Sequence, residues 1–234
     1  MAVLESFSVT EKPILILASN SPRRRQLLSL AGWTFNASAA DLDESQLPNE
    51  SPADYVLRLA ELKARAITAD AHQIILAADT AVVDGIDILG KPKDYEEAIA
   101  MLKRLRGHTH QVYTGIALLR LSDGLLLKDL CVTDVPMRDY SDEEILAYVQ
   151  TDDPLDKAGA YAIQHPGFHP VAMPSHGEES IRGCYANVMG LPMCYVLLLM
   201  RKIDIQPNTD VFALCETSLG NECAVAEAIL RGEI

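Results

Sequence analysis

Short apolar runs alternate with amphipathic stretches along most of the chain, and this alternation predicts a mixed α/β protein. Residues 14–18 and 74–78 are apolar runs bounded by polar residues, a pattern typical of buried strands. Residues 33–37 are expected to be extended. Residues 111–121 and 125–137 are long β-forming stretches separated by a Ser-Asp-Gly turn, so they predict two antiparallel strands.

Helix starts are marked by side chains that can cap free backbone N–H groups. Ser21 is followed by Pro22, which suits the first helical position because a missing N–H costs nothing there. Ser141 with Glu144 has the spacing of a capping box. By such signals, helices are predicted over residues 22–32, 51–69, 94–105 and 141–150, with a further helix from 192 onward.

Composition and charge narrow the function classes. With 234 residues, 49% of them hydrophobic, the chain can bury a sizeable core as one unit or as two lobes. A formal net charge of −13 disfavours nucleic acid and anionic membranes as partners, so an anionic ligand would need a local basic pocket. The longest apolar runs, such as 195–200, are too short to span a bilayer, and no secretory leader pattern is present. We therefore expect a cytoplasmic protein, and its five cysteines, without a C-x-x-C pair, to be reduced and structural.

Residues 19–25, SNSPRRR, join a predicted strand to a predicted helix. Such a junction presents free N–H groups and the positive end of a helix dipole, which together favour a phosphate. Cations in the first turn oppose that dipole, so the three arginines indicate an anionic ligand rather than helix stability. The alternatives are a solvated basic patch or ion pairs with acids such as Asp41 and Asp43.

Two further segments carry reactive side chains. Asp79 follows the apolar run 74–78, so we expect the strand to end there and the carboxylate to emerge at the sheet edge. Lys91 lies between glycine and proline, in a constrained loop that can hold an ammonium group against a phosphate. By themselves these two are equally consistent with a carboxylate bonded to turn amides and a solvated lysine. Asp156 and Lys157 form a charged turn before Ala-Gly-Ala, a weak signal that also fits a loop with an internal ion pair.

Together these segments resemble the Maf family of nucleoside triphosphate pyrophosphatases. The resemblance extends from about residue 15 to about residue 201, and the ordered set of motifs is far more specific than any one of them. The family implies an elongated, two-lobed mixed α/β fold with a mixed sheet and a central cleft, related to inosine triphosphate pyrophosphatases. The motifs are ASNSPRRRQLL, DLDES, RLAELKA, AADTAVV, LGKPKDYEEAIAMLKRLRGHTHQVYTGIAL, PLDKAGAYAIQ and NVMGLP.

The resemblance also implies a reaction, in which pyrophosphate is removed from a nucleoside triphosphate in the presence of a divalent metal. Asp79 matches the catalytic acidic residue of the family's A-D-T motif, which is proposed to activate water. Arg24 matches the phosphate-binding arginine of S-P-R-R, with Ser19 at the start of the same loop. The remaining matches are Glu44 to the acidic position of D-E-S, Lys63 to the lysine of L-A-x-x-K-A, and Lys91 to the lysine of G-K-P.

Substrate choice divides the family at three positions. The branch acting on dTTP and UTP is similar to this chain at Arg23, Thr80 and Gln164, whereas the branch acting on methylated GTP usually departs at all three. The resemblance therefore implies hydrolysis of dTTP and UTP, with modified pyrimidine nucleotides as further candidates, to the monophosphate and pyrophosphate.

Phosphate chemistry fits the same residues independently. Attack of water on the α-phosphorus builds negative charge on the non-bridging oxygens and on the leaving pyrophosphate, so clustered cations are needed. The cations that can supply this positive charge are Arg23, Arg24, Lys63 and Lys91. Because Mg²⁺ favours carboxylates, water and phosphate oxygens, Glu44 and Asp79 are the candidate metal ligands, with Mn²⁺ as the alternative ion.

One region departs from the family pattern. After Gln164 the family usually continues with glycine and a short hairpin, whereas this chain reads HPGFHPVAMPSHGEESIRGCYANV. His165 and His169 have a spacing seen in metal sites, but Pro166 and Pro170 disfavour the helix that would put both rings on one face. A polar loop near the cleft mouth is the preferred interpretation.

The ends of the chain lie outside the family motifs. We predict an N-terminal extension over residues 1–12, a Maf-like pyrophosphatase domain over 13–204 and a helical tail over 205–234. The tail has helical apolar spacing, so it packs either on its own chain or on a second subunit in a homodimer.

Two other functions compete with the enzyme. One is a regulator of cell division without essential turnover, since the family was first named for an effect on septum formation. The other is a protein that senses nucleotides, which would keep Arg24 and Lys91 but has no need of Asp79. The presence of Asp79 together with Glu44 favours the enzyme.

Overall fold

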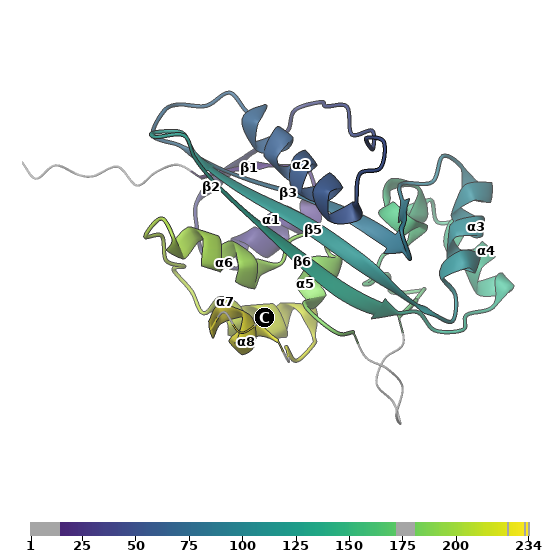
Figure 1. The fold of residues 1–234 in the computed structure, drawn as a ribbon. Helices are drawn as coiled ribbons and strands as arrows, with labels where there is room; N and C mark the ends of the chain where they lie inside the picture. The colour runs from purple at the N-terminus through teal and green to yellow at the C-terminus, as the bar shows by residue number, and fades with distance from the viewer. Residues whose placement is uncertain (1–14, 172–180, 224, 232, 234) are drawn as a thin grey trace, which may run out of the picture.

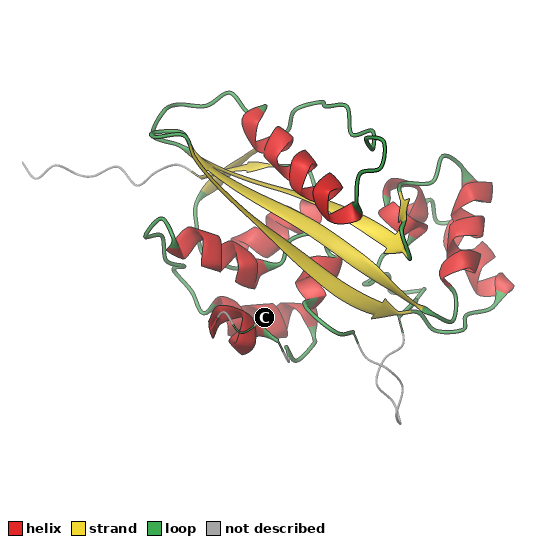
Figure 2. Ribbon diagram, in the orientation of Figure 1, coloured by secondary structure: helices red, strands yellow, loops and turns green. Residues whose placement is uncertain are grey.

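The computed structural model describes residues 15–171, 181–223, 225–231 and 233. It confirms the mixed α/β class: a six-stranded mixed sheet carries helices on both faces (Figures 1 and 2). The strand order is β2-β1-β3-β5-β6, with β4 paired to β3 outside this path. The strands are β1 (Leu15–Ala18), β2 (Phe35–Ser38), β3 (Ile74–Asp84), β4 (Asp87–Leu89), β5 (Thr109–Arg120) and β6 (Leu125–Pro136).

Strand direction changes at β3. The pairs β1–β2 and β1–β3 are parallel, whereas β4 and β5 both pair with β3 in the antiparallel sense, and β5 pairs with β6 in the same sense. The long β5–β6 hairpin turns at the predicted Ser-Asp-Gly sequence, where Gly124 adopts a φ of 73°. Strands β3 and β4 form a tight hairpin, in which Asp84 pairs with Asp87 across Gly85.

The helices begin where their caps predict. Ser21, Ser51, Asp94 and Ser141 each accept a hydrogen bond from a backbone N–H in the first turn, and Ser141 with Glu144 completes a capping box. The α-helices are α1 (Pro22–Ser29), α2 (Pro52–Arg65), α3 (Tyr95–Leu105), α4 (Asp142–Val149), α5 (Tyr185–Val188), α6 (Met193–Arg201), α7 (Val211–Leu219) and α8 (Ala226–Arg231), and two 3₁₀ turns are η1 (Asp153–Asp156) and η2 (Ala158–Ala160).

Residue alternation along β3 divides the core between the two faces of the sheet. Ile75 and Ala77 pack with residues of α2, whereas Leu76 and Ala78 pack with residues of α1 and α6 on the other face. A separate apolar cluster forms at the far end of the long strands, where α3 and α4 pack together (Figure 1). These clusters give the elongated molecule its two lobes.

The tail forms helices α7 and α8, which pack on their own chain. Val211 is buried in the same apolar cluster as residues of α6, and α6 contacts α8. Within the part of the chain that the structure describes, no helix has the length and apolar character needed to cross a bilayer.

Two predicted boundaries are wrong. The second helix ends at Arg65 rather than near residue 69, because the β-branched Ile67 and Thr68 disfavour helix and Ile67 is buried against the apolar cluster below α2. The strand beginning at Ile74 does not end before Asp79. Its ladder with β5 continues from Ile74 to Val83, since backbone pairing does not depend on the polarity of the side chains.

A glycine sets the distance between α2 and the sheet. A Cβ added to Gly115 of β5 would lie 2.4 Å from the carbonyl oxygen of Val56 and 2.7 Å from the nitrogen of Leu57, which are backbone atoms of α2. Gly115 is also the register partner of Asp79. The backbone of the helix therefore lies directly against the sheet at the position that pairs with this carboxylate.

We expect Gly115→Ala to lower the free energy of unfolding by about 1–3 kcal/mol, because a methyl group here must push the backbone of α2 away from the sheet. Urea unfolding of the two proteins measures the difference. Gly90→Ala is the matched control, since a Cβ at Gly90 meets open space. Equal unfolding midpoints for wild type and Gly115→Ala would refute the tight contact.

Candidate active site

A cleft of about 590 Å³ opens where β1 ends. The pairing of β1 with β3 stops at Leu17 and Leu76, and the pairing of β4 with β3 starts only at Val82. Because β5 occupies the other edge of β3, the edge between Leu76 and Val82 has no strand partner on the β1 side among the described residues. This is the crevice beyond the carboxyl ends of parallel strands, where open α/β sheets bind ligands.

The position of Asp79 corrects the sequence prediction. Asp79 lies in the middle of an 11-residue strand, not at its end. Its side chain reaches the cleft because the neighbouring strand β1 is only four residues long. Asp79 and Thr80 then point to opposite faces, so Asp79 bonds to a side chain of α2 and Thr80 to a side chain of α1.

The acidic side of the cleft is a small charge cluster. The Nζ atom of Lys63 lies 2.5 Å from Oδ1 of Asp79 and 2.7 Å from Oε1 of Glu44, so one ammonium group bridges two carboxylates. The side chain of Asp79 is 7% exposed and that of Glu44 is 54% exposed. Burial raises the pKa of Asp79 above its ordinary value, against the opposing effects of Lys63 and Arg24. A carboxylate in this state is a better proton acceptor than one in water.

Arg24 forms the opposite side and is held by three groups. Its Nε donates to the carbonyl of Gly190 at 2.8 Å, its Nη2 to Oγ1 of Thr80 at 3.0 Å, and its Nη1 to Oγ of Ser19 at 3.5 Å. Burial lowers the pKa of this guanidinium, and the nearby charge of Asp79 raises it. These three contacts fix the side chain in the cleft wall.

The other arginines of the run behave differently. Arg23 lines the cleft, and within the described residues no hydrogen bond or ion pair engages its guanidinium. Arg25 turns back to the carbonyl of Asn20. In the described part of the chain, no ion pair links these arginines to Asp41 or Asp43, which removes one of the alternatives to an anionic ligand.

The remaining wall comes from the second lobe. Lys91 and Gln164 line the cleft, and both are exposed. The turn that precedes Gln164 is tied to the loop of Lys91, because the N–H of Gly159 donates to the carbonyl of Gly90 at 3.1 Å. Gly159 has a φ of 69°, and a Cβ there would meet Val82 of β3 at 2.8 Å.

Lys157 is the cleft residue that sequence reasoning undervalued. It is buried, and its Nζ donates to the carbonyl and carboxylate of Asp153 and to the carboxylate of Asp156. The internal ion pair considered for this turn is therefore present, but it is part of the cleft wall. Gly190 is the other omission, since no side-chain pattern signals that its carbonyl holds Arg24.

All the residues proposed from the sequence line this one cleft. They come from both lobes and from segments far apart in the chain. They are Ser19, Arg23, Arg24, Glu44, Lys63, Asp79, Thr80, Lys91 and Gln164.

His165 and His169 both lie outside any helix, as the neighbouring prolines predict. Nδ1 of His165 accepts the N–H of Gly167 at 3.1 Å, and its ring packs edge-on against Tyr148. His169 is exposed. Across the residues that the structure describes, no cluster of three or more histidine, cysteine or acidic side chains is arranged for a metal ion. Residues 172–180 of this departure from the family pattern lie outside the described residues.

Curated relatives match most of the chain. The dTTP/UTP pyrophosphatase of Anaeromyxobacter dehalogenans (strain 2CP-C) is 46% identical over 192 residues, covering 81% of this chain and 94% of the relative. That of Geobacter sulfurreducens is 46% identical over 195 residues, covering 82% and 98%. The solved structure of a HAM1 protein from Coxiella burnetii is a weaker match, with 16% identity, a TM-score of 0.39 and coverage of 53% of this chain and 73% of that chain, too slight to carry an argument.

The family comparison covers the cleft as a whole. Residues 14–203 match the model of the family described as Maf-like protein, and this range contains all the cleft residues named above as well as both lobes. The chain therefore belongs to the Maf-like protein family.

Proposed function

We propose that this protein is a nucleoside triphosphate pyrophosphatase that hydrolyses dTTP and UTP to the monophosphate and pyrophosphate. The observation that carries the proposal is the charge arrangement of the cleft: a buried carboxylate, Asp79, faces a set of cations suited to a triphosphate. The relatives named dTTP/UTP pyrophosphatase support the same assignment.

The proposed reaction is attack of water on the α-phosphorus. The new bond joins the water oxygen to the α-phosphorus, and the bond to the oxygen that bridges the α- and β-phosphates breaks, so pyrophosphate leaves with that oxygen. Asp79 accepts the proton of the attacking water, and Lys63 keeps the carboxylate oriented at 2.5 Å. Arg24 is already fixed beside the cleft, so it can stabilise the developing phosphate charge without reorganisation.

A divalent metal is part of the proposal. Glu44 and Asp79 both pair with Lys63, so their carboxylates lie on the same side of the cleft and are the candidate ligands. Mg²⁺ is commonly held by one or two carboxylates together with substrate phosphates, and the two side chains fit that requirement, with Mn²⁺ as the alternative. When bound, the ion would neutralise charge on the phosphate oxygens.

A regulator that binds nucleotide without turnover is a weaker proposal. Binding alone would be served by Arg23, Arg24 and Lys91. It gives no reason to bury a carboxylate among phosphate-binding groups, where it repels the ligand and is costly to desolvate. Asp79 therefore favours turnover.

The products test the proposed function directly. With Mg²⁺ present, dTTP and UTP are expected to yield the monophosphate and pyrophosphate, because the attack is at the α-phosphorus. Separation of the products by anion-exchange chromatography identifies them. Release of orthophosphate and diphosphate as the only primary products would contradict the proposal.

We expect Asp79→Asn to lower kcat by roughly 10²- to 10⁴-fold, because it removes the proton acceptor, while the fold and nucleotide binding persist. Steady-state kinetics together with nucleotide titration separate the two effects. Asp84→Asn is the matched control, since Asp84 is another paired carboxylate of β3 but bonds to Arg104 away from the cleft. Wild-type turnover in folded Asp79→Asn would make Asp79 a structural residue.

Base selection is assigned to Gln164. Uracil and thymine present a carbonyl beside a ring N–H, which one amide can match by donating to the first and accepting from the second. Cytosine replaces part of this pattern with an amino group and an unprotonated nitrogen. The exposed amide of Gln164 lines the cleft, and in the described structure no hydrogen bond occupies it.

We expect Gln164→Ala to reduce the preference for UTP over CTP by roughly tenfold, because an unpaired polar group then no longer penalises cytosine. The ratio of kcat/KM for the two nucleotides measures this, and the Mg²⁺ dependence should be unchanged. Gln150→Ala, at an exposed glutamine outside the cleft, serves as control. A UTP/CTP ratio equal to that of wild type would show that Gln164 does not select the base.

A further inference from the structure

Glu44 belongs to a segment without regular secondary structure. Residues 39–51 connect β2 to α2 and contain neither helix nor strand, yet Glu44 lines the cleft and pairs with Lys63. An exposed loop of this kind is usually mobile unless its backbone is held. The position of this carboxylate therefore depends on what holds the loop.

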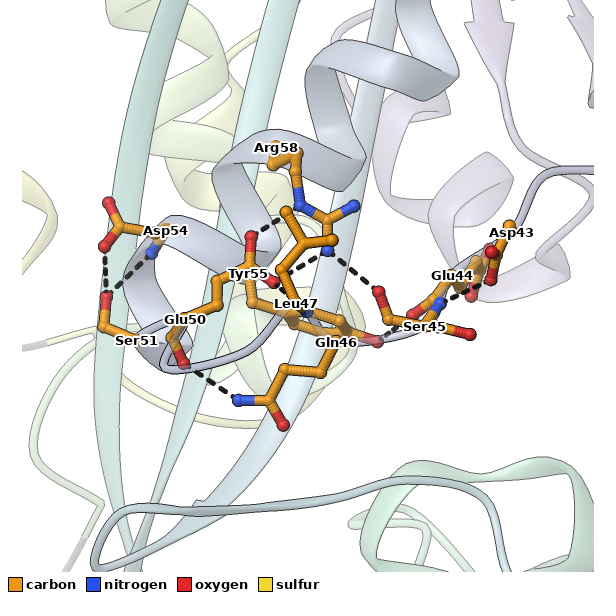
Figure 3. Close-up of polar contacts among 10 residues, drawn as sticks. All are labelled: Asp43, Glu44, Ser45, Gln46, Leu47, Glu50, Ser51, Asp54, Tyr55 and Arg58. Atoms are coloured by element: carbon orange, nitrogen blue, oxygen red, sulfur yellow. Dashed lines mark hydrogen bonds and ion pairs between the residues drawn. The ribbon is translucent and has the colours of Figure 1, made fainter.

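Side chains of α2 hold the loop backbone. The hydroxyl of Tyr55 donates to the carbonyl of Glu44 at 3.0 Å, and Nη2 of Arg58 donates to the carbonyl of Ser45 at 3.1 Å. Figure 3 shows both side chains reaching from the helix to consecutive peptide groups of the loop. Tyr55 and Arg58 are three positions apart, so they project from the same face of the helix.

An ion pair closes the loop against the same helix. The carboxylate of Glu50 accepts from Nε of Arg58 at 2.5 Å and from Nη2 at 2.7 Å, in a two-point contact. It also accepts the N–H of Leu47 at 3.0 Å. The side chain of Glu50 is 7% exposed and that of Arg58 is 24% exposed, so the ion pair is partly shielded from water.

Helix α2 thus holds Glu44 at two points. Tyr55 binds its backbone carbonyl, and Lys63, two turns further along α2, binds its carboxylate. Neither Tyr55 nor Arg58 is among the residues that line the cleft. Their contacts act on the site through the loop.

We propose that Tyr55, Arg58 and Glu50 form a clamp that positions the carboxylate of Glu44 for a divalent metal ion. They are positioning residues, and the inference rests on the proposed function, in which Glu44 is a metal ligand. Groups that orient metal ligands through hydrogen bonds typically change metal affinity by 10- to 100-fold when removed.

Tyr55→Phe is the sharpest test, because it deletes one hydroxyl and keeps the ring. With a non-hydrolysable UTP analogue present, we expect the variant to bind Mn²⁺ about tenfold more weakly than wild type, measured by electron paramagnetic resonance of free Mn²⁺. Raising the Mg²⁺ concentration should restore its kcat. The same substitution in a Glu44→Gln background should cause no further loss of Mn²⁺ affinity, because the clamp acts through Glu44.

Tyr113→Phe is the matched control. Its hydroxyl donates to Oε1 of Gln111 at 3.0 Å, and the residue does not line the cleft. This variant should bind Mn²⁺ like wild type. Arg58→Lys provides a second disruption that keeps the charge but loses the two-point contact with Glu50, and it should weaken Mn²⁺ binding in the same way.

Two results would overturn the clamp. One is unchanged Mn²⁺ affinity in both Tyr55→Phe and Arg58→Lys. The other is an equal loss from Tyr55→Phe in the wild-type and Glu44→Gln backgrounds, which would mean that Tyr55 acts by another route. Either result, with wild type still releasing pyrophosphate from UTP, rejects the clamp and leaves the proposed function standing. Failure of wild type to release pyrophosphate rejects the function itself.

Discussion

The burial of the Asp79 carboxylate is the constraint on which the arrangement of charges in the cleft depends. Removing Asp79 from water raises its pKa, and the cost is offset because Lys63 approaches to 2.5 Å and Arg24 lies nearby. Lys63 belongs to α2, and the backbone of this helix packs directly on β5 at Gly115, the register partner of Asp79. A small residue, a close helix and a buried ion pair are therefore parts of one arrangement.

The side chains that line the cleft differ in how firmly contacts with the rest of the protein hold them. The side chains of Arg24 and Lys63 bond to other protein groups, and these bonds hold them in place. Arg23, Lys91 and Gln164 line the same cleft, and no protein partner engages them in the described structure. Fixed groups suit the charge that develops during reaction, whereas free groups suit recognition of an arriving ligand. The tie between Gly159 and Gly90 joins the segments that carry two of these free groups, so the second lobe presents them together.

Local signals in the sequence predicted most element starts. Ser21, Ser51 and Ser141 cap helices because their side chains bond to N–H groups only three residues away. The positions where helices and strands end were less predictable from the sequence. Helix α2 stops at Arg65 because Ile67 is drawn into the core, and β3 passes through Asp79 because β5 pairs with it along its length. Both outcomes depend on residues distant in the chain.

The sequence by itself identified nine residues of the cleft, since all nine candidates lie there. Arg24, Asp79 and Lys91 were indicated by their places beside predicted strands and helices. The resemblance to the Maf family supplied the others, among them Glu44, Lys63 and Gln164. Only the tertiary structure decided how they work together. Asp79 lies at an open strand edge because the pairing of β1 with β3 stops at Leu17 and Leu76. The carbonyl of Gly190 holds Arg24, and Lys157 is buried in the cleft wall. These features arise from contacts between segments up to 166 residues apart, and no local pattern encodes a distance across the fold.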